Sequence, residues 1–149
     1  MTGEKLTGEQ LFLRYAFPCA SSRLAGGKIN MQHFLELKQL IEDAEQPRRG
    51  LLSFCFPNAA RRLRDYAIVN GLGRWDLATV KGLWRRHHGH KDECRVLRCE
   101  VIAVGNDEVK TIALCEWEGE QFIAINLYNL PLQKGCSVYV HRRTIVEIE

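Results

Sequence analysis

The chain has 149 residues, of which 46% are hydrophobic and 26% are charged, close to the averages of ordinary globular proteins. This composition excludes a collagen, a long disordered tail and a coiled-coil rod. Apolar runs are only a few residues long, far short of the roughly 20 needed to span a bilayer, and the start of the chain does not resemble a secretory signal. We expect a cytoplasmic protein without a membrane segment, whose six cysteines are mostly reduced.

The net charge of +3 hides a difference between the two halves of the chain. Residues 1–93 hold 15 Lys and Arg against 10 Asp and Glu, whereas residues 94–149 hold 6 against 8. The first part therefore carries +5 and the second −2. This asymmetry indicates two modules with a boundary near residues 89–93.

The first module is predicted to be helical. Thr7 and Gln10 fit a capping box at the start of a helix that we expect Pro18 to stop. Asn30 is the expected cap of a second helix, which carries apolar residues on one face and ends before Pro47.

Two further helices are predicted before residue 90. The third begins around Pro57 or Asn58 and is closed by Asn70-Gly71, and its arginines point largely outward. The fourth begins after Asp76 and ends at Gly89. Together the four helices predict a helical domain over residues 1–90.

The apolar pattern changes from helical to alternating after residue 94. Alternation predicts five strands, at 95–104, 109–117, 121–127, 137–141 and 144–148. We expect turns at 105–107, at Glu118-Gly119 and at Arg142-Arg143. Five short strands joined by tight turns favour a closed barrel, since closure removes exposed edges. The predicted fold class is α+β, with a helical domain followed by a small OB-like β-barrel at residues 93–149.

Part of the barrel resembles a known family. The segments VIAV at 101–104, KGCSVYVH at 134–141 and IVEI at 145–148 are similar to the first and closing strands of the hydrogenase-assembly chaperones of the HypC/HupF family. The resemblance covers about a third of the chain, and the helical half has no counterpart in it. It implies a HypC-like barrel.

The resemblance also implies a role in binding and delivery. In that family a cysteine and the histidine of the penultimate strand help to hold an iron centre, and the barrel docks onto a maturation scaffold and the enzyme precursor. Cys94 and His141 are the matching positions. The family's cysteine follows the initiator Met, whereas Cys94 is internal, so we expect a related barrel with a changed role.

A second observation points to metal at the module boundary. The segment HHGHKDEC at 87–94 combines imidazoles with a thiol, the ligands that suit iron or zinc. His87 or His90, together with Cys94 and His141, could form a site. The spacing matches no standard zinc motif. The other interpretation is a solvated linker whose histidines cap the preceding helix.

Positive charge is concentrated in residues 46–91, with an excess of +8. Such a segment attracts phosphate or an acidic protein, although a basic face can equally be solvated and unoccupied. The candidate residues for a partner or nucleic acid are Arg61, Arg62, Arg64, Arg85, Arg86, Arg142 and Arg143.

Common catalytic motifs are missing from the sequence, including GxSxG, the phosphate-binding loop GxxxxGK[ST] and HExxH. We therefore expect a protein that is not an enzyme. The first hypothesis is an accessory protein that binds a partner protein and a metal centre during metalloenzyme assembly, of the hydrogenase type. The alternative is a nucleic-acid-binding protein that uses the basic helices and the barrel.

Overall fold

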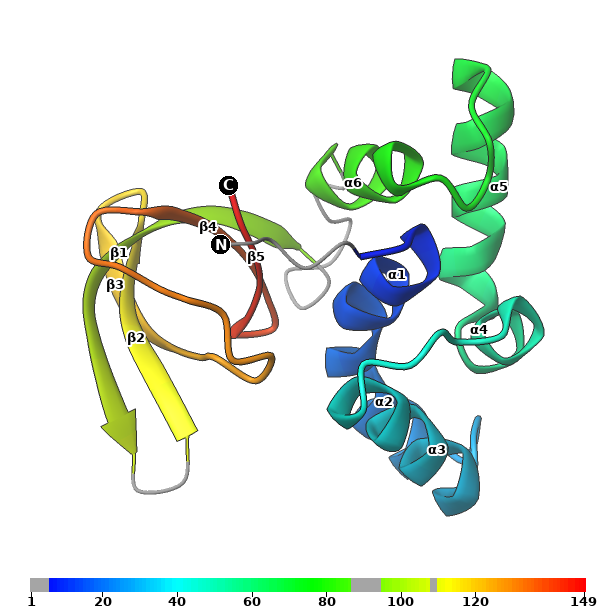
Figure 1. Cartoon of the computed structure of the whole chain (residues 1–149), viewed down its shortest axis with the longest axis horizontal. Coiled ribbons are helices and arrows are strands. Elements are labelled where there is room, and N and C mark those ends of the chain that lie inside the picture. The colour runs from blue at the N-terminus through cyan, green and yellow to red at the C-terminus, as the bar shows by residue number, and fades with distance from the viewer. Residues whose placement is uncertain (1–5, 87–94, 108–109) are drawn as a thin grey trace. The chain divides into compact units, whose positions relative to one another are not determined.

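The computed structural model describes residues 6–86, 95–107 and 110–149. The chain divides into two compact units, Met1–Trp84 and Arg85–Glu149. Helices make up the first part and a closed five-stranded barrel the second (Figure 1), which confirms the predicted α+β class. Within these described residues, no helix has the length and apolar character needed to cross a membrane.

The helices follow one another with short connections. Their bounds are α1 (Gly8–Ala16), the 3-10 helix η1 (Phe17–Cys19), α2 (Ala20–Ala25), α3 (Met31–Glu42), α4 (Arg49–Cys55), α5 (Pro57–Asn70) and α6 (Leu77–Arg86). The predicted capping box is confirmed, because the Thr7 hydroxyl accepts from the Gln10 backbone at 3.1 Å. Asn30 caps α3 in the same way, and Gly71 ends α5 with a left-handed φ of 65°.

The first helix ends before Pro18, as expected, but the helices α2 and α4 were not predicted. Helix α1 ends at Ala16, and the chain continues through η1, which contains Pro18, directly into α2. A proline is tolerated in the first turn of a helix, where its missing N–H has no intrahelical partner to lose. Helix α4 was not predicted, because it has seven residues and its N-cap residue, Arg48, makes no side-chain capping bond.

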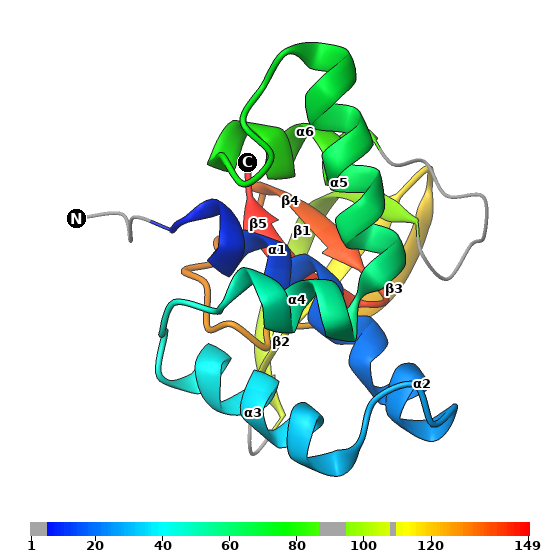
Figure 2. The same ribbon diagram turned by 90° about the vertical axis from the view of Figure 1, so that its right-hand side faces the viewer.

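Aromatic rings of α1 form the centre of the first unit. Phe12 makes edge contacts with Trp75 and Trp84, at centroid distances of 5.2 and 6.1 Å, and with Phe56 at 6.3 Å. Tyr15 stacks on Trp84 at 5.2 Å. Figure 2 shows α1 surrounded by α4, α5 and α6. Burying these large side chains contributes to the hydrophobic driving force of this unit.

The start of α1 packs closely against the backbone at Trp75. A Cβ atom at Gly8 would lie 1.8 Å from the Trp75 carbonyl oxygen, whereas one at Gly50 in α4 would meet no atom within 4 Å. Position 8 therefore admits only glycine, and position 50 does not require it.

The five strands close in the order β1-β2-β3-β5-β4. They are β1 (Val96–Asp107), β2 (Lys110–Trp117), β3 (Glu120–Ile125), β4 (Ser137–His141) and β5 (Thr144–Ile148). All neighbours are antiparallel except β3 and β5, which are parallel. The turn expected at 105–107 was wrong, because these residues pair with β2 at Ile112, Thr111 and Lys110. Alternation near a hairpin does not show where the strand stops.

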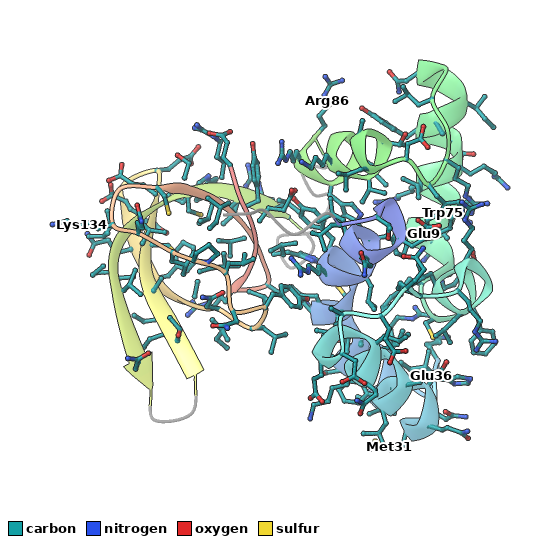
Figure 3. All side chains as sticks on the ribbon, viewed as in Figure 1. Glu9, Met31, Glu36, Trp75, Arg86 and Lys134 are labelled. Carbon is teal, nitrogen blue, oxygen red and sulfur yellow. The ribbon has the colours of Figure 1, made fainter. Side chains whose placement is uncertain are left out.

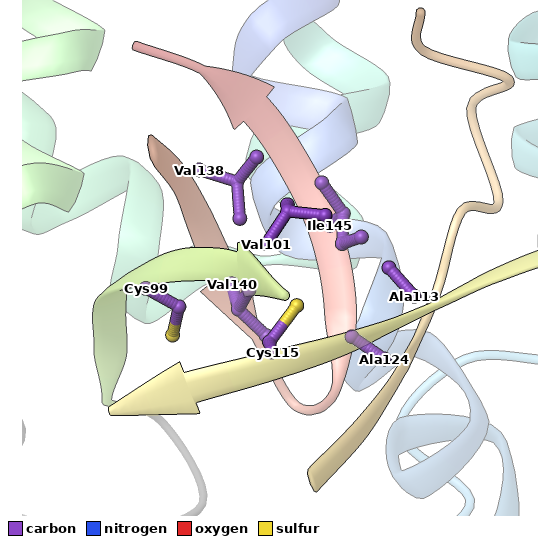
Figure 4. Packing of buried hydrophobic residues seen from close by; sticks show 8 residues of the cluster. All are labelled: Cys99, Val101, Ala113, Cys115, Ala124, Val138, Val140 and Ile145. Atoms are coloured by element: carbon purple, nitrogen blue, oxygen red, sulfur yellow. The ribbon is translucent and has the colours of Figure 1, made fainter. Parts of the chain in front are cut away.

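Small side chains fill the interior of the barrel (Figure 4). The central cluster consists of Cys99, Val101, Ala113, Cys115, Ala124, Val138, Val140 and Ile145. A five-stranded barrel has room inside for little more than such residues. Both predicted two-residue hairpins are present, Glu118-Gly119 between β2 and β3 and Arg142-Arg143 between β4 and β5.

Candidate functional site

The predicted metal site depends on four residues, of which the structure describes one. His87, His90 and Cys94 lie outside the described residues. His141 ends β4, where its Cα is the partner of Val96 in β1 and of Thr144 in β5. Its side chain is fully buried.

His141 does not face the interior of the barrel. Its neighbour Val140 belongs to the central cluster, and successive side chains of a strand point to opposite faces. The imidazole is therefore directed to the outer face of β4. Over residues 6–86, 95–107 and 110–149, no group of three or more His, Cys, Asp or Glu side chains could hold a metal ion.

The cysteines of the strands are core residues, as expected. Cys99 and Cys115 are at most 2% exposed. Burial raises the pKa of the Cys99 thiol to about 12 and that of Cys115 to about 11. Because the thiolate is the form that attacks or binds metal, these two side chains act as small hydrophobes at neutral pH.

Three of the predicted contact arginines lie on α5. Arg61, Arg62 and Arg64 are all exposed, as the helical pattern predicted. Arg64 is paired with the adjacent carboxylate of Asp65 at 3.1 Å. Arg86, at the end of α6, is also exposed and extends away from the helix in Figure 3.

Arg85 has a different environment from the other predicted contact residues. Its guanidinium donates to both carboxylate oxygens of Glu147 at 3.2 and 3.3 Å, and its Cζ lies 4.4 Å from the centroid of the Tyr139 ring. Glu147 is 8% exposed. A bidentate, half-buried pair that also stacks on an aromatic ring is structural in character, so Arg85 is not part of an open basic face.

A second network on the outer face of the barrel involves Glu149. Its carboxylate accepts from both the Arg98 guanidinium and the Tyr139 hydroxyl, the latter at 2.8 Å. These hydrogen bonds lower the pKa of Glu149 to about 2, and the one from Arg98 has the largest effect. The same contact with Glu149 raises the pKa of Arg98. The carboxylate is therefore charged at any pH at which the protein would work.

One end of the barrel forms an open pocket of about 590 Å³, which we call the barrel mouth. Leu97, Phe122 and Val140 form its apolar floor, and Trp117 forms part of the wall. All four side chains occupy inward-facing strand positions: Val140 belongs to the central cluster, and the other three pack against it. Among the residues that the structure describes, the mouth is thus the end of the barrel core that no segment covers.

The rim of the barrel mouth is polar and mostly cationic. Its lining includes Arg95, Arg142 and Arg143, together with Glu120 and Gln121. The Arg95 Cζ lies 4.9 Å from the centroid of the Trp117 ring, within the range of a cation–π contact. Three guanidinium groups against one carboxylate give the rim an excess of positive charge.

Sequence reasoning identified the two hairpin arginines but missed the rest of the mouth. Trp117 and Phe122 flank the Glu118-Gly119 turn at inward-facing positions. The sequence offered one signal for the mouth, namely large aromatic residues at the strand ends and small residues at the strand centres. This size pattern predicts that aromatic side chains line an opening at the end of the barrel.

No family model, curated protein or solved structure matches this chain.

Proposed function

We propose that this chain is a non-catalytic accessory protein with a HypC-like barrel, which binds a partner protein and a metal centre during metalloenzyme assembly. The observation that carries the proposal is the fully buried imidazole of His141 at the end of β4. His141 is the position that the resemblance assigns as the imidazole ligand, and Cys94, which lies outside the described residues, is the position that it assigns as the thiol.

The donor types suit the proposed cargo. Imidazole nitrogen and thiolate sulfur are preferred ligands of both zinc and iron. His87 and His90 precede Cys94 by seven and four positions and could complete the set. The cysteines at the barrel centre do not compete, because burial raises the pKa of Cys99 and Cys115 far above neutral.

Metal content tests the proposal. The full chain is purified anaerobically, loaded with Fe²⁺ or Zn²⁺, and quantified as wild type, Cys94→Ser and Cys136→Ser. Cys136 is a half-buried barrel thiol that no ligand hypothesis includes, so it is the matched control. We expect loss of metal in Cys94→Ser alone. Equal metal content in all three proteins would reject the site.

The assembly role needs a separate measurement. Affinity capture from native cells should recover a metalloenzyme precursor or a maturation factor, and Cys94→Ser should recover less of it. Repeated recovery of ribosomal components only would contradict this role.

A second candidate function is nucleic-acid binding, favoured by the exposed arginines of α5. Arg61, Arg62 and Arg64 lie on one short stretch of helix, where they could contact successive phosphates. Binding of labelled RNA and DNA at about 0.1 M salt should weaken steeply as salt rises. Arg61→Glu should reduce the affinity, and Lys38→Glu, the same charge change on α3, should not. Absence of binding at micromolar protein would reject this candidate.

A further inference from the structure

The barrel mouth has the dimensions of a small-molecule site. Its volume of about 590 Å³ falls within the range of 300–1,000 Å³ that is usual for such pockets. Its floor is apolar, with the half-buried side chains of Leu97 and Phe122 beside the buried Val140. Mouths of β-barrels are a common position for ligand sites.

The wall and the rim favour a particular ligand chemistry. Trp117 and Phe122 present aromatic surface, and the planar Arg95 guanidinium is already ordered over the Trp117 ring. Nucleobases stack on such aromatic and guanidinium planes with little dependence on sequence. Arg142 and Arg143 stand at the rim, and guanidinium groups bind phosphate with paired hydrogen bonds.

The backbone of the rim hairpin gives an independent argument. Arg142 and Arg143 have φ values of 50° and 59°, in the left-handed region that favours glycine and asparagine. The other tight hairpin has the same shape but places Gly119 at its second position. Strained residues of this kind cluster at ligand sites. Glu118 takes the place of Arg142 in the other hairpin with a φ of 49°, so Arg143, where that hairpin has glycine, is the distinctive strained residue of the rim.

We propose that the barrel mouth binds a nucleotide unit, with the base against the floor and the Trp117 wall and the phosphate held by the rim arginines. An acidic peptide would use the rim charge but would not need the aromatic wall. The inference deepens the second candidate function by adding a site separate from α5, and it is independent of the accessory role. The nucleotide could be free or one unit of a single strand.

Binding measurements on the full chain distinguish these sources. Titration calorimetry measures the binding of adenosine and uridine monophosphates, of the same nucleosides without phosphate, and of a Glu-rich peptide that contains aromatic residues. Fluorescence anisotropy measures the binding of a labelled single strand of eight nucleotides. The variants are Arg143→Ala and Trp117→Phe, with Lys38→Ala on α3 as the control and Arg61→Ala as a probe of α5. Both tested arginines are exposed, so neither substitution should prevent folding, and circular dichroism verifies this.

We expect monophosphates, the strand or both to bind at least tenfold more tightly than nucleosides. Arg143→Ala should weaken binding about tenfold, Trp117→Phe should weaken it less, and Lys38→Ala should leave monophosphate binding unchanged. Binding of the strand alone, weakened by Arg61→Ala and unaffected by Arg143→Ala, would overturn the inference while sparing the second candidate function. Peptide binding without nucleotide binding would overturn the inference, and no binding of any ligand would reject both.

Discussion

Replacing Arg143 with glycine should make the barrel more stable, although it removes a charged side chain. Arg143 is exposed and has a φ of 59° at the second position of the tight hairpin between β4 and β5. The corresponding position of the β2–β3 hairpin is Gly119, with a φ of 82°. The substitution therefore gives the strained hairpin the residue that the relaxed one already has.

The size of the effect follows from two opposing terms. A left-handed conformation costs an L-residue about 1–2 kcal/mol that glycine does not incur. Glycine also loses more backbone entropy on folding than arginine does, and this reduces the stabilisation by about 0.5–1 kcal/mol. The net gain in the free energy of unfolding should be about 0.5–1 kcal/mol. The Arg143 carbonyl, which accepts from the Ile125 N–H at 2.7 Å, remains in every variant.

Urea denaturation of the wild type, Arg143→Gly and Arg143→Ala measures this difference. Alanine removes the guanidinium but keeps the Cβ, so its stability should be within about 0.5 kcal/mol of the wild type. Glycine should exceed alanine by about 1 kcal/mol. If glycine is no more stable than alanine, the backbone of this hairpin is not strained, and one support for the barrel-mouth site is lost. By that proposal, the stabilised Arg143→Gly protein should also bind nucleotide about tenfold more weakly.

Three further outcomes are expected. Gly8→Ala should lower the free energy of unfolding by about 1–3 kcal/mol because its Cβ would collide with backbone, whereas Gly50→Ala should raise it by about 0.5–1 kcal/mol, both measured in urea. Because the pKa of Glu149 is lowered in the folded protein, its ionised carboxylate stabilises the fold above about pH 4.5, and this stabilisation is lost as the pH falls toward 2. The difference in the free energy of unfolding between wild type and Glu149→Gln should therefore shrink across that interval. A constant difference would contradict this reasoning. The raised pKa values of Cys99 and Cys115 should protect both thiols from iodoacetamide at pH 8 until the chain unfolds, and mass spectrometry showing rapid native labelling would refute their burial.

The local signals of the sequence predicted most elements of the fold. The Thr7 and Asn30 caps and the left-handed Gly71 act within one helical turn, so their residues reveal helix ends directly. Strict alternation and two-residue turns located β4 and β5 to the residue. The same signals failed where the local information was weak, at α4 and at the end of β1.

The candidate site could be predicted only in part. The hairpin arginines were found because a turn is a local feature, and the burial of Cys99 and Cys115 followed from their strand positions. The sequence assigned Arg85 to a basic face, but its partner Glu147 is 62 positions away. No local rule connects residues so distant in the chain.

The sequence by itself determined the two-part α+β organisation, the strand alternation and the exposure of the α5 arginines, because these depend on the periodicity of neighbouring residues. Only the tertiary structure decided which residues share a surface. Closure of the barrel brings Arg95, Trp117, Phe122 and Arg143 from four separate segments to one opening. It also directs His141 to the outer face of β4, away from that opening, because side chains alternate along the strand that Val140 anchors in the core.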